Sequence, residues 1–270
     1  MQANTTRSGR ARRAFTLVEV LVTISIISIL LAILLPALGK ARTASRQTLA
    51  LVNARTVAMS FDEYLNDNDE TYPFIPLRED PNIPGGGEAV YFQWWPENTF
   101  IGVSDAFALE WAWPAVLKSV APWQESYPVW VSPGMSTDLP ENPPDFGEDD
   151  SEPAEEFISW RLSSAFLGDP KIWDADDPGT DASLHRAVRR GEVTFASSKV
   201  LLWDTHLAYL RGAPELREGH WDAPTPMAFA DGHAAVNNPL DAREGVSNAL
   251  RFGDDRRLHN TADGAKGIDY

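Results

Sequence analysis

An uncharged apolar run near the start of the chain constrains its fold more than any other feature. Residues Val20 to Gly39 are 20 consecutive residues without a charge. A helix of that length is about 30 Å long, which matches the hydrocarbon thickness of a bilayer. Residues 1–14 carry four arginines and no acid. The sequence therefore predicts one membrane-spanning helix, with its basic flank on the cytoplasmic side.

Three interpretations of this segment differ in where the chain is cut. In the first, the run is an uncleaved anchor. In the second, it is a secretory signal that is cut at the small residues of Ala37-Leu38-Gly39. In the third, a leader is cut off between Ala14 and Phe15 and the run stays in the mature chain. Glu19 favours the third interpretation. A signal peptide gains nothing from an acid at the start of its apolar region, and a lone carboxylate in hydrocarbon is unfavourable unless it has a partner.

The segment Arg13-Ala14-Phe15-Thr16-Leu17-Val18-Glu19 resembles the processing site of type IV prepilins and type II secretion pseudopilins. The resemblance implies that a prepilin peptidase cuts between Ala14 and Phe15 and that the new amine of Phe15 is methylated. Glu19 is the fifth residue counted from Phe15, and the resemblance implies that it meets the charged amine of a neighbouring subunit and sets the register of assembly. Most prepilins have glycine where this chain has Ala14.

Pro36 is the 22nd residue counted from Phe15, at a position where many pilins also carry a proline. A proline inside a helix lacks the backbone N–H donor and kinks or ends the helix. We therefore expect a kink, a helix end, or both at Pro36.

Beyond Gly39 the apolar residues recur at helical spacing and predict one continuous buried face. They are Ala50, Ala54, Val57, Phe61 and Tyr64. Turn-forming residues at 66–69 predict that the helix ends near Leu65. We therefore expect a helix of about 50 residues. The expected division is a cytoplasmic leader at 1–14, a transmembrane helix at 15–39, an amphipathic stalk at 40–70 and an extracytoplasmic globular domain at 71–270.

The rest of the chain predicts a small, loop-rich, antiparallel β-sheet domain, so the expected fold class is α+β. Strands are expected at 127–131, 157–162 and 193–203, and irregular loops at 73–87 and 132–156. Residues 105–120 are expected to be partly helical, and the part with the stronger helical pattern is expected to begin at Pro114. A hairpin is expected at 227–236, with positive φ at both Asp231 and Gly232.

Composition excludes several classes of function. The formal net charge is −16, so the surface repels phosphate backbones and a nucleic-acid partner is not expected. The chain has no cysteine, which excludes disulfides and thiolate chemistry. The ten tryptophans are interpreted as core residues, with a sugar-binding platform as the alternative.

Five polar residues of the second half have side chains that divalent metals accept as ligands. They are Asp204, His206, His220, Asp231 and His233. The competing interpretation is that Asp231 forms a turn and the histidines are ordinary polar residues, and we prefer it. The acidic run 174–181 resembles a calcium loop but has a proline at a ligand position and lacks the final glutamate. We expect no cofactor, with calcium as the alternative because some major pseudopilins hold it in a C-terminal loop.

A second similarity lies near the end of the chain. Residues Phe229-Ala230-Asp231-Gly232-His233 are similar to the C-terminal signature of a large family of prepilin-like bacterial proteins. In that signature a histidine precedes Asp-Gly by nine intervening residues, whereas ten residues separate His220 from Asp231 here. The dipeptide Ser132-Pro133 stands where many members have Cys-Pro.

The function that these resemblances imply is structural, not enzymatic. We expect a pilin-like or pseudopilin subunit of a type II secretion or type IV pilus-like filament, held in the bacterial inner membrane by a single pass. Its expected partners are prepilin peptidase, other pilin-like subunits and the membrane. The alternative is a membrane-anchored extracytoplasmic metal-dependent enzyme or ligand-binding protein.

Overall fold

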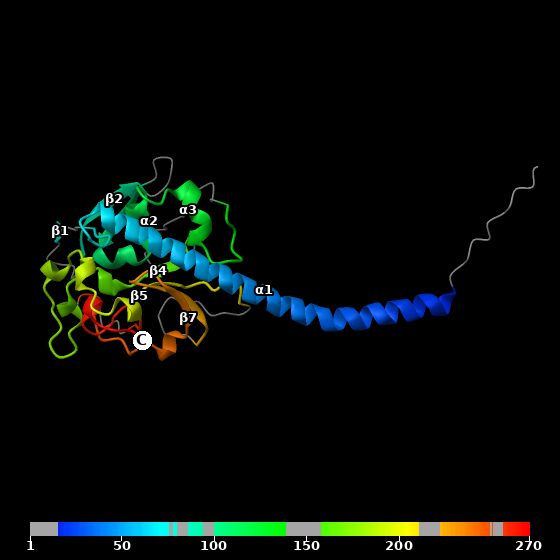
Figure 1. Cartoon of the computed structure of the whole chain (residues 1–270). Coiled ribbons are helices and arrows are strands. Elements are labelled where there is room, and N and C mark those ends of the chain that lie inside the picture. Colours follow the sequence, from blue (N-terminus) through cyan, green and yellow to red (C-terminus); the bar gives the residue numbers. More distant parts are fainter. Residues whose placement is uncertain are drawn as a thin grey trace, which may run out of the picture. The chain divides into compact units, whose positions relative to one another are not determined.

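The structure is a computed structural model that describes residues 16–75, 78–79, 86–93, 100–138, 158–210, 222–248, 250 and 256–270. It divides into two compact units, Met1–Ala44 and Ser45–Tyr270, each of which is described by itself. Helix α1, Leu17–Asp67, is 51 residues long and contributes to both units (Figure 1). The predicted long helix is thus confirmed, and it ends two residues beyond the predicted position.

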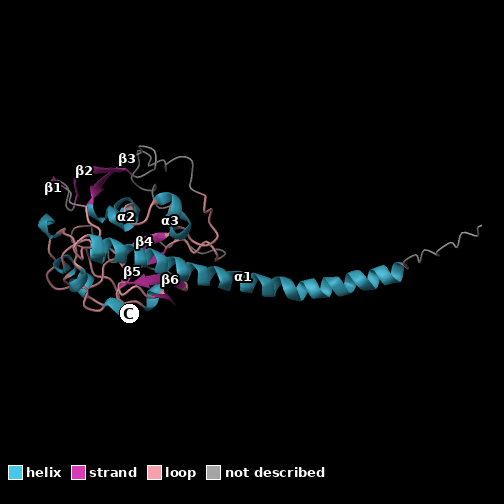
Figure 2. Cartoon of the chain, turned by 45° about the horizontal axis from the view of Figure 1, so that its top comes forward, coloured by secondary structure: helices cyan, strands magenta, loops and turns pink. Residues whose placement is uncertain are grey.

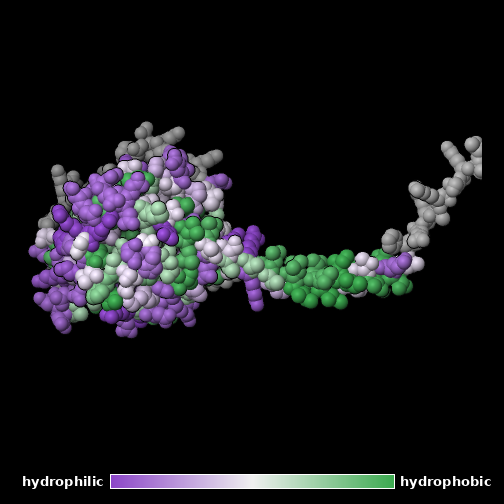
Figure 3. Space-filling model, in the orientation of Figure 1, coloured by the Kyte–Doolittle hydropathy of each residue, from purple (hydrophilic) through white to green (hydrophobic). Residues whose placement is uncertain are grey.

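In the first unit α1 is apolar on all sides. Residues 16–42 are exposed without exception, and the face seen in Figure 3 is almost continuously hydrophobic over this part of the helix. A helix that is apolar all round needs an apolar environment, which is either a protein core or a bilayer. Nothing in the described part of the chain covers this segment.

In the second unit α1 buries one face against the domain. Its buried residues recur every three or four positions, as a helix face requires: Ala50, Asn53, Ala54, Val57, Ala58, Phe61 and Leu65. The ring of Phe61 lies 5.4 Å from that of Trp113 on helix α2, Leu109–Leu117. Figures 1 and 2 show α2 on one side of this part of α1 and strand β5 on the other. The amphipathic half of α1 is therefore a core element.

Helix α2 corrects one expectation. Pro114 lies in its interior and does not open it. Leu109, Trp113 and Leu117 are buried at a spacing of four residues, and this burial extends the helix to five residues before the proline. The indole N–H of Trp113 donates to the carbonyl of Trp160 at 2.9 Å, which ties α2 to the sheet.

Helix α3, Trp123–Trp130, replaces the strand that was expected at 127–131. Trp123, Tyr127 and Trp130 are buried at helical spacing, and the rings of Trp123 and Trp130 meet edge to face at 4.7 Å. Aromatic burial on one face thus outweighs the presence of Pro128 inside the helix.

The main sheet is antiparallel throughout and has its four strands in sequence order. The strands are β4 (Trp160–Leu162), β5 (Val200–Asp204), β6 (Thr225–Phe229) and β7 (Ala234–Asn237). The expected strand at 193–203 begins later, because residues 196–198 form a 3₁₀ turn. The α+β class is confirmed, with a long helix and a small antiparallel sheet.

A second antiparallel sheet has the order β1 (Arg78–Glu79), β2 (Gly86–Gln93) and β3 (Phe100–Asp105). The expectation of one irregular loop over 73–87 is therefore wrong at 78–79 and 86–87. Of the expected loop at 132–156, residues 139–156 lie outside the described residues, and the start of the loop is not solvated because Ser132 and Pro133 are buried.

The end of the sequence packs into the second unit. The Asp269 carboxylate accepts from the backbone N–H of Val200 at 2.8 Å and lies 3.3 Å from the ammonium of Lys199. Both charged side chains are almost fully buried. Burial lowers the pKa of Lys199, and the neighbouring Asp269 carboxylate opposes that shift. A charge pair taken out of water in this way is favourable only while both partners are present.

Candidate processing and assembly segment

The N-terminus of α1 is closed by a reciprocal pair of hydrogen bonds between Thr16 and Glu19. The Glu19 carboxylate accepts from the backbone N–H and the hydroxyl of Thr16, both at 2.8 Å. The Thr16 hydroxyl in turn accepts from the backbone N–H of Glu19 at 3.2 Å. This arrangement is a capping box, in which residues three apart satisfy each other's free N–H groups. Its sequence signal is the Thr-x-x-Glu spacing, from which the box could have been predicted.

The hydroxyl groups inside the apolar run are satisfied within the helix. Thr23, Ser25 and Ser28 each donate to the carbonyl four residues earlier, at 2.7 to 2.8 Å. An unsatisfied hydroxyl in hydrocarbon is unfavourable, so these bonds let polar side chains remain in an apolar segment. Between Glu19 and Gly39, the helix therefore exposes apolar side chains and hydroxyl groups whose hydrogen bonds are made within the helix.

Pro36 lies inside α1, which continues for 31 residues beyond it. The alternative of a helix end at this residue is therefore wrong. Proline has no N–H, so the carbonyl of Ala32 lacks its usual helical donor at this point. Pro36 is a site of weakened backbone bonding within an uninterrupted helix.

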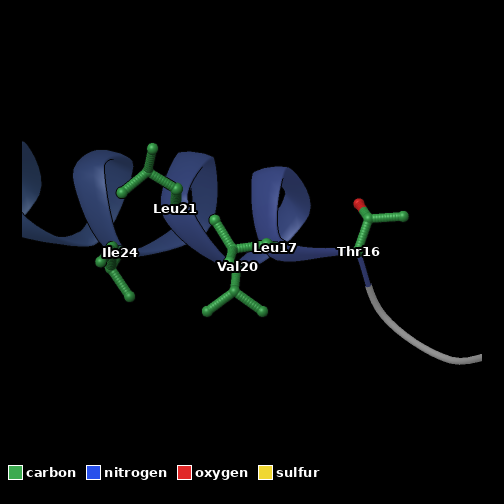
Figure 4. Close-up of a pocket in the computed structure, with 5 residues that line it drawn as sticks. All are labelled: Thr16, Leu17, Val20, Leu21 and Ile24. Carbon is green, nitrogen blue, oxygen red and sulfur yellow. The ribbon is translucent and has the colours of Figure 1, made fainter.

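Helix α1 is long and apolar enough to cross a membrane by length and composition. Leu17, Val20, Leu21 and Ile24 project from its first turns, next to Thr16, and line a shallow groove of about 400 Å³ (Figure 4). The groove is open along the helix surface, so it is a feature of the apolar face and not an enclosed binding site. Ala14 and Phe15, the residues of the predicted cleavage, lie outside the described residues.

Asp204 and His206, two of the five potential metal ligands, have different surroundings. Asp204 ends β5 and is completely buried, whereas His206 lies beyond the strand and is half-buried. The Asp204 carboxylate accepts from the Ser132 hydroxyl at 2.7 Å and from the backbone N–H groups of His206 and Leu207 at 3.0 and 3.1 Å. Burial raises the pKa of Asp204 to about 6, and these hydrogen bonds oppose the shift. Asp204 therefore holds loops together.

Asp231 and His233 lie at the turn between β6 and β7. The Asp231 carboxylate approaches the His233 ring nitrogen Nδ1 at 2.5 Å, and the His233 ring stacks on Phe229 with centroids 4.2 Å apart. Of Asp231 and Gly232, only Gly232 has positive φ, at 84°, so the expectation of positive φ at Asp231 is wrong. The N–H of Gly232 donates to the carbonyl of Phe229, as in a turn followed by a left-handed glycine.

The acidic run 174–181 uses its carboxylates locally. Asp174 accepts from the backbone N–H groups of Asp176 and Asp177, and Asp181 accepts from that of Ser183. The backbone bonds hold the pKa of Asp174 below its ordinary value, and a bond from the Ser183 hydroxyl, together with the backbone bond, does the same for Asp181. Among the described residues no group of three or more metal-ligand side chains could hold an ion. His220 lies outside those residues.

The described tryptophans belong mainly to the core. Six of them are buried: Trp113, Trp123, Trp130, Trp160, Trp173 and Trp203. The alternative of an exposed aromatic platform for sugars gains no support from these six. Trp94, Trp95 and Trp221 lie outside the described residues.

Comparison with known proteins bears on the N-terminal segment. Residues 9–35 match the family described as the prokaryotic N-terminal methylation motif. The match includes the predicted cleavage position, Glu19 and most of the apolar run. Together with the long helix and the small antiparallel domain, it supports a prepilin-like protein. The match covers the N-terminal segment alone, and the pilin-like proteins that carry this motif are structural in character.

No curated protein and no solved structure matches the chain. The similarity of the C-terminal part to the prepilin-like family with the His and Asp-Gly signature therefore stays a prediction.

Proposed function

We propose that this chain is a structural subunit of a type II secretion or type IV pilus-like filament. In this proposal a prepilin peptidase removes residues 1–14, and the mature subunit is held in the bacterial inner membrane by residues 15–39 until it enters the filament. Residues 40–70 form the stalk and residues 71–270 the extracytoplasmic domain. The observation that carries the proposal is the methylation motif at residues 9–35, which includes most of the exposed apolar segment of α1 at residues 16–42.

The capping box gives Glu19 two possible partners. In the single subunit its carboxylate accepts from Thr16, and in the filament it would meet the charged amine of a neighbouring Phe15. The exchange is reasonable because both partners are donors and a positive charge is the stronger one. The capping box keeps the carboxylate satisfied until a neighbour arrives.

The experiment that tests the proposal is mass spectrometry of the N-terminal peptide of the full chain extracted from bacterial membranes. We expect a peptide that begins with methylated Phe15. A chain that begins at Met1 or at Lys40 would contradict the proposal, because the first is an uncleaved anchor and the second a secreted domain.

Substitution of Glu19 separates its two bonds. Glutamine at this position also forms a capping box but carries no charge. We expect Glu19→Gln and Glu19→Ala to insert into the membrane at normal levels and both to fail to assemble, as measured by the amount of sheared filament. Thr16→Val keeps the carboxylate and removes the hydroxyl that donates to it and accepts from the backbone N–H of Glu19, and this variant should assemble. Normal filament levels for Glu19→Gln would show that only the capping bond matters.

A further inference from the structure

The C-terminal segment meets the start of strand β5 at a buried amine and a buried carboxylate that the proposed function does not use. Lys199 is completely buried and Asp269 is 2% exposed. The Lys199 Nζ lies 3.3 Å from Oδ1 of Asp269. Because Cγ of Asp269 is bonded to Oδ1, it lies within about 4.5 Å of Nζ, and a shift of about 1 Å brings the two atoms to reacting distance. An amine and a carboxyl group held in this way are the two reactants of an amide bond.

Backbone hydrogen bonds fix both residues in place. The N–H of Asp269 donates to the carbonyl of Ser198 at 3.0 Å, and its carbonyl accepts from the N–H of Arg243 at 2.9 Å. The carbonyl of Lys199 accepts from the N–H of Ala230 at 2.9 Å. The two side chains therefore approach each other from anchored segments, so little conformational freedom is lost when they react.

The Thr261 hydroxyl bridges the two reacting groups. It accepts from Nζ of Lys199 at 2.5 Å and donates to Oδ1 of Asp269. A proton that leaves the amine has a hydrogen-bonded path through this hydroxyl to Oδ1. Thr261 is itself buried, so bulk water does not compete for the path.

The second carboxylate oxygen of Asp269 has a different partner. Its Oδ2 accepts from the backbone N–H of Val200 at 2.8 Å. A fixed donor at this position stabilises the negative charge that develops on a carboxyl oxygen when a nucleophile adds to its carbon. Oδ1 thus lies at the end of a proton path, and Oδ2 faces a fixed dipole. This asymmetry suits a reaction in which Oδ1 leaves and Oδ2 stays.

The surroundings also favour the reactive form of the amine. Burial lowers the pKa of Lys199, and the neighbouring Asp269 opposes the shift. Only an uncharged amine is a nucleophile, so burial raises the fraction of Lys199 that can attack. Out of water, the ion pair exchanges with an uncharged pair when one proton moves from Nζ to the carboxylate, and the uncharged pair is the one that reacts.

We propose that Lys199 and Asp269 form an intramolecular amide bond in the folded chain. Nζ of the uncharged amine adds to Cγ of the protonated carboxyl group, and one amine proton passes through the Thr261 hydroxyl to Oδ1. The bond between Cγ and Oδ1 then breaks, and Oδ1 leaves with two protons as water. The product is one amide with Oδ2 as its carbonyl oxygen. The reaction is a condensation, so it consumes no oxidant and no reductant.

The amide bond fastens the C-terminal segment to the interior of the main sheet, because β5 lies between β4 and β6. The chain has no cysteine, so a disulfide cannot provide such a link. The bond closes a loop from residue 199 to residue 269, and a cross-link over a long loop stabilises mainly by restricting the unfolded chain. The inference concerns the folded domain and goes beyond the proposed function.

The test is mass spectrometry of a tryptic digest of the unmodified full chain, extracted from bacterial membranes and unfolded in urea before digestion. An amide at Lys199 blocks cleavage there, so we expect a branched peptide that joins residues 191–211 to residues 267–270. Its mass should be about 18 Da below the sum of its two parts, since one water has left. Separate peptides that end at Lys199 and that span residues 267–270, with no branched peptide, would overturn the proposal.

Substitutions test the role of each group. Lys199→Arg and Asp269→Ala should give no branched peptide, whereas Asp263→Asn, which changes an exposed acid of the same segment, should leave it unchanged. We expect Thr261→Val to slow formation of the amide about 100-fold in newly made chain and Thr261→Ser to restore it. Formation at the unmodified rate in Thr261→Val would overturn the proton path.

The N-terminal peptide of the same digest reports on processing separately. A branched peptide from chains that begin at Met1 supports the amide bond and contradicts the proposed processing. Methylated Phe15 without the branched peptide overturns the amide bond alone.

Discussion

A single buried carboxylate, that of Asp204, joins two segments that are 72 residues apart in the sequence. The Ser132 hydroxyl donates to Asp204 and also accepts from the backbone N–H of Ala208 at 2.9 Å. The loop that begins at Ser132 and the loop that follows β5 are therefore held by one side-chain pair. Such a bond between distant segments leaves no mark in the local sequence.

The raised pKa of Asp204 makes stability depend on pH in a defined direction. Because its pKa is about 6 in the folded chain and 3.8 ordinarily, the folded chain binds the proton more tightly. The resulting stabilisation is complete below pH 3.8 and is lost as the pH rises through about 6. Relative to Asp204→Asn, we expect the unmodified chain to gain about 2 kcal/mol of unfolding free energy between pH 7 and about pH 4.5.

The measurement is urea unfolding of the full chain in detergent, followed by tryptophan fluorescence. Comparison with Asp204→Asn isolates the group, because the amide oxygen still accepts the two backbone N–H bonds. Burial lowers the pKa of His185 to about 4, so its protonation lowers the unfolding free energy as the pH falls. This contribution is the same in both chains and cancels in the comparison. An equal pH profile for the two chains would contradict the prediction.

At the scale of the elements, the sequence predicts α1 well because its signals are local. An uncharged run, a helical repeat of apolar residues and turn residues near the end determine its type and length. Helix α3 was not predicted, since Pro128 argues against a helix and only the spacing of Trp123, Tyr127 and Trp130 favours one. The capping box at Thr16 could have been predicted from the sequence. The exposure of Leu49, Val52 and Met59 on α1 could not, because exposure depends on what packs nearby.

The hairpin between β6 and β7 provides a test of one element. Gly232 has φ of 84°, and an added Cβ would meet only the Asp62 carboxylate at 3.5 Å, which is an ordinary contact. Any effect of Gly232→Ala therefore arises from the backbone conformation. We expect it to lower the unfolding free energy by about 1 kcal/mol.

Gly191→Ala is the matched control for this substitution, because Gly191 has open space around it and no positive φ. Its unfolding free energy should be nearly unchanged in the same urea titration. Equal effects at positions 191 and 232 would show that the left-handed turn does not matter for stability.

At the scale of the whole molecule, the division at Ala44 and Ser45 predicts how the chain responds to protease. Lys40 and Arg42 are exposed on a stretch of α1 that no described residue covers. We expect mild trypsin treatment of detergent-extracted chain to cut there and to release a soluble fragment that ends at Tyr270. Its tryptophan emission should match that of the intact chain, because the buried tryptophans lie in the second unit. Cleavage mainly within residues 100–138 would contradict this division.

The buried face of α1 has a consequence for how the sequence can diverge. Between Ser45 and Asp67 one face is committed to the core, and Leu49, Val52 and Met59 are exposed on the opposite side, so the buried positions of this helix accept few new residues without loss. Surface loops of the domain are not restricted in this way. Descendants of one ancestral chain should therefore retain the helix and drift fastest in the loops.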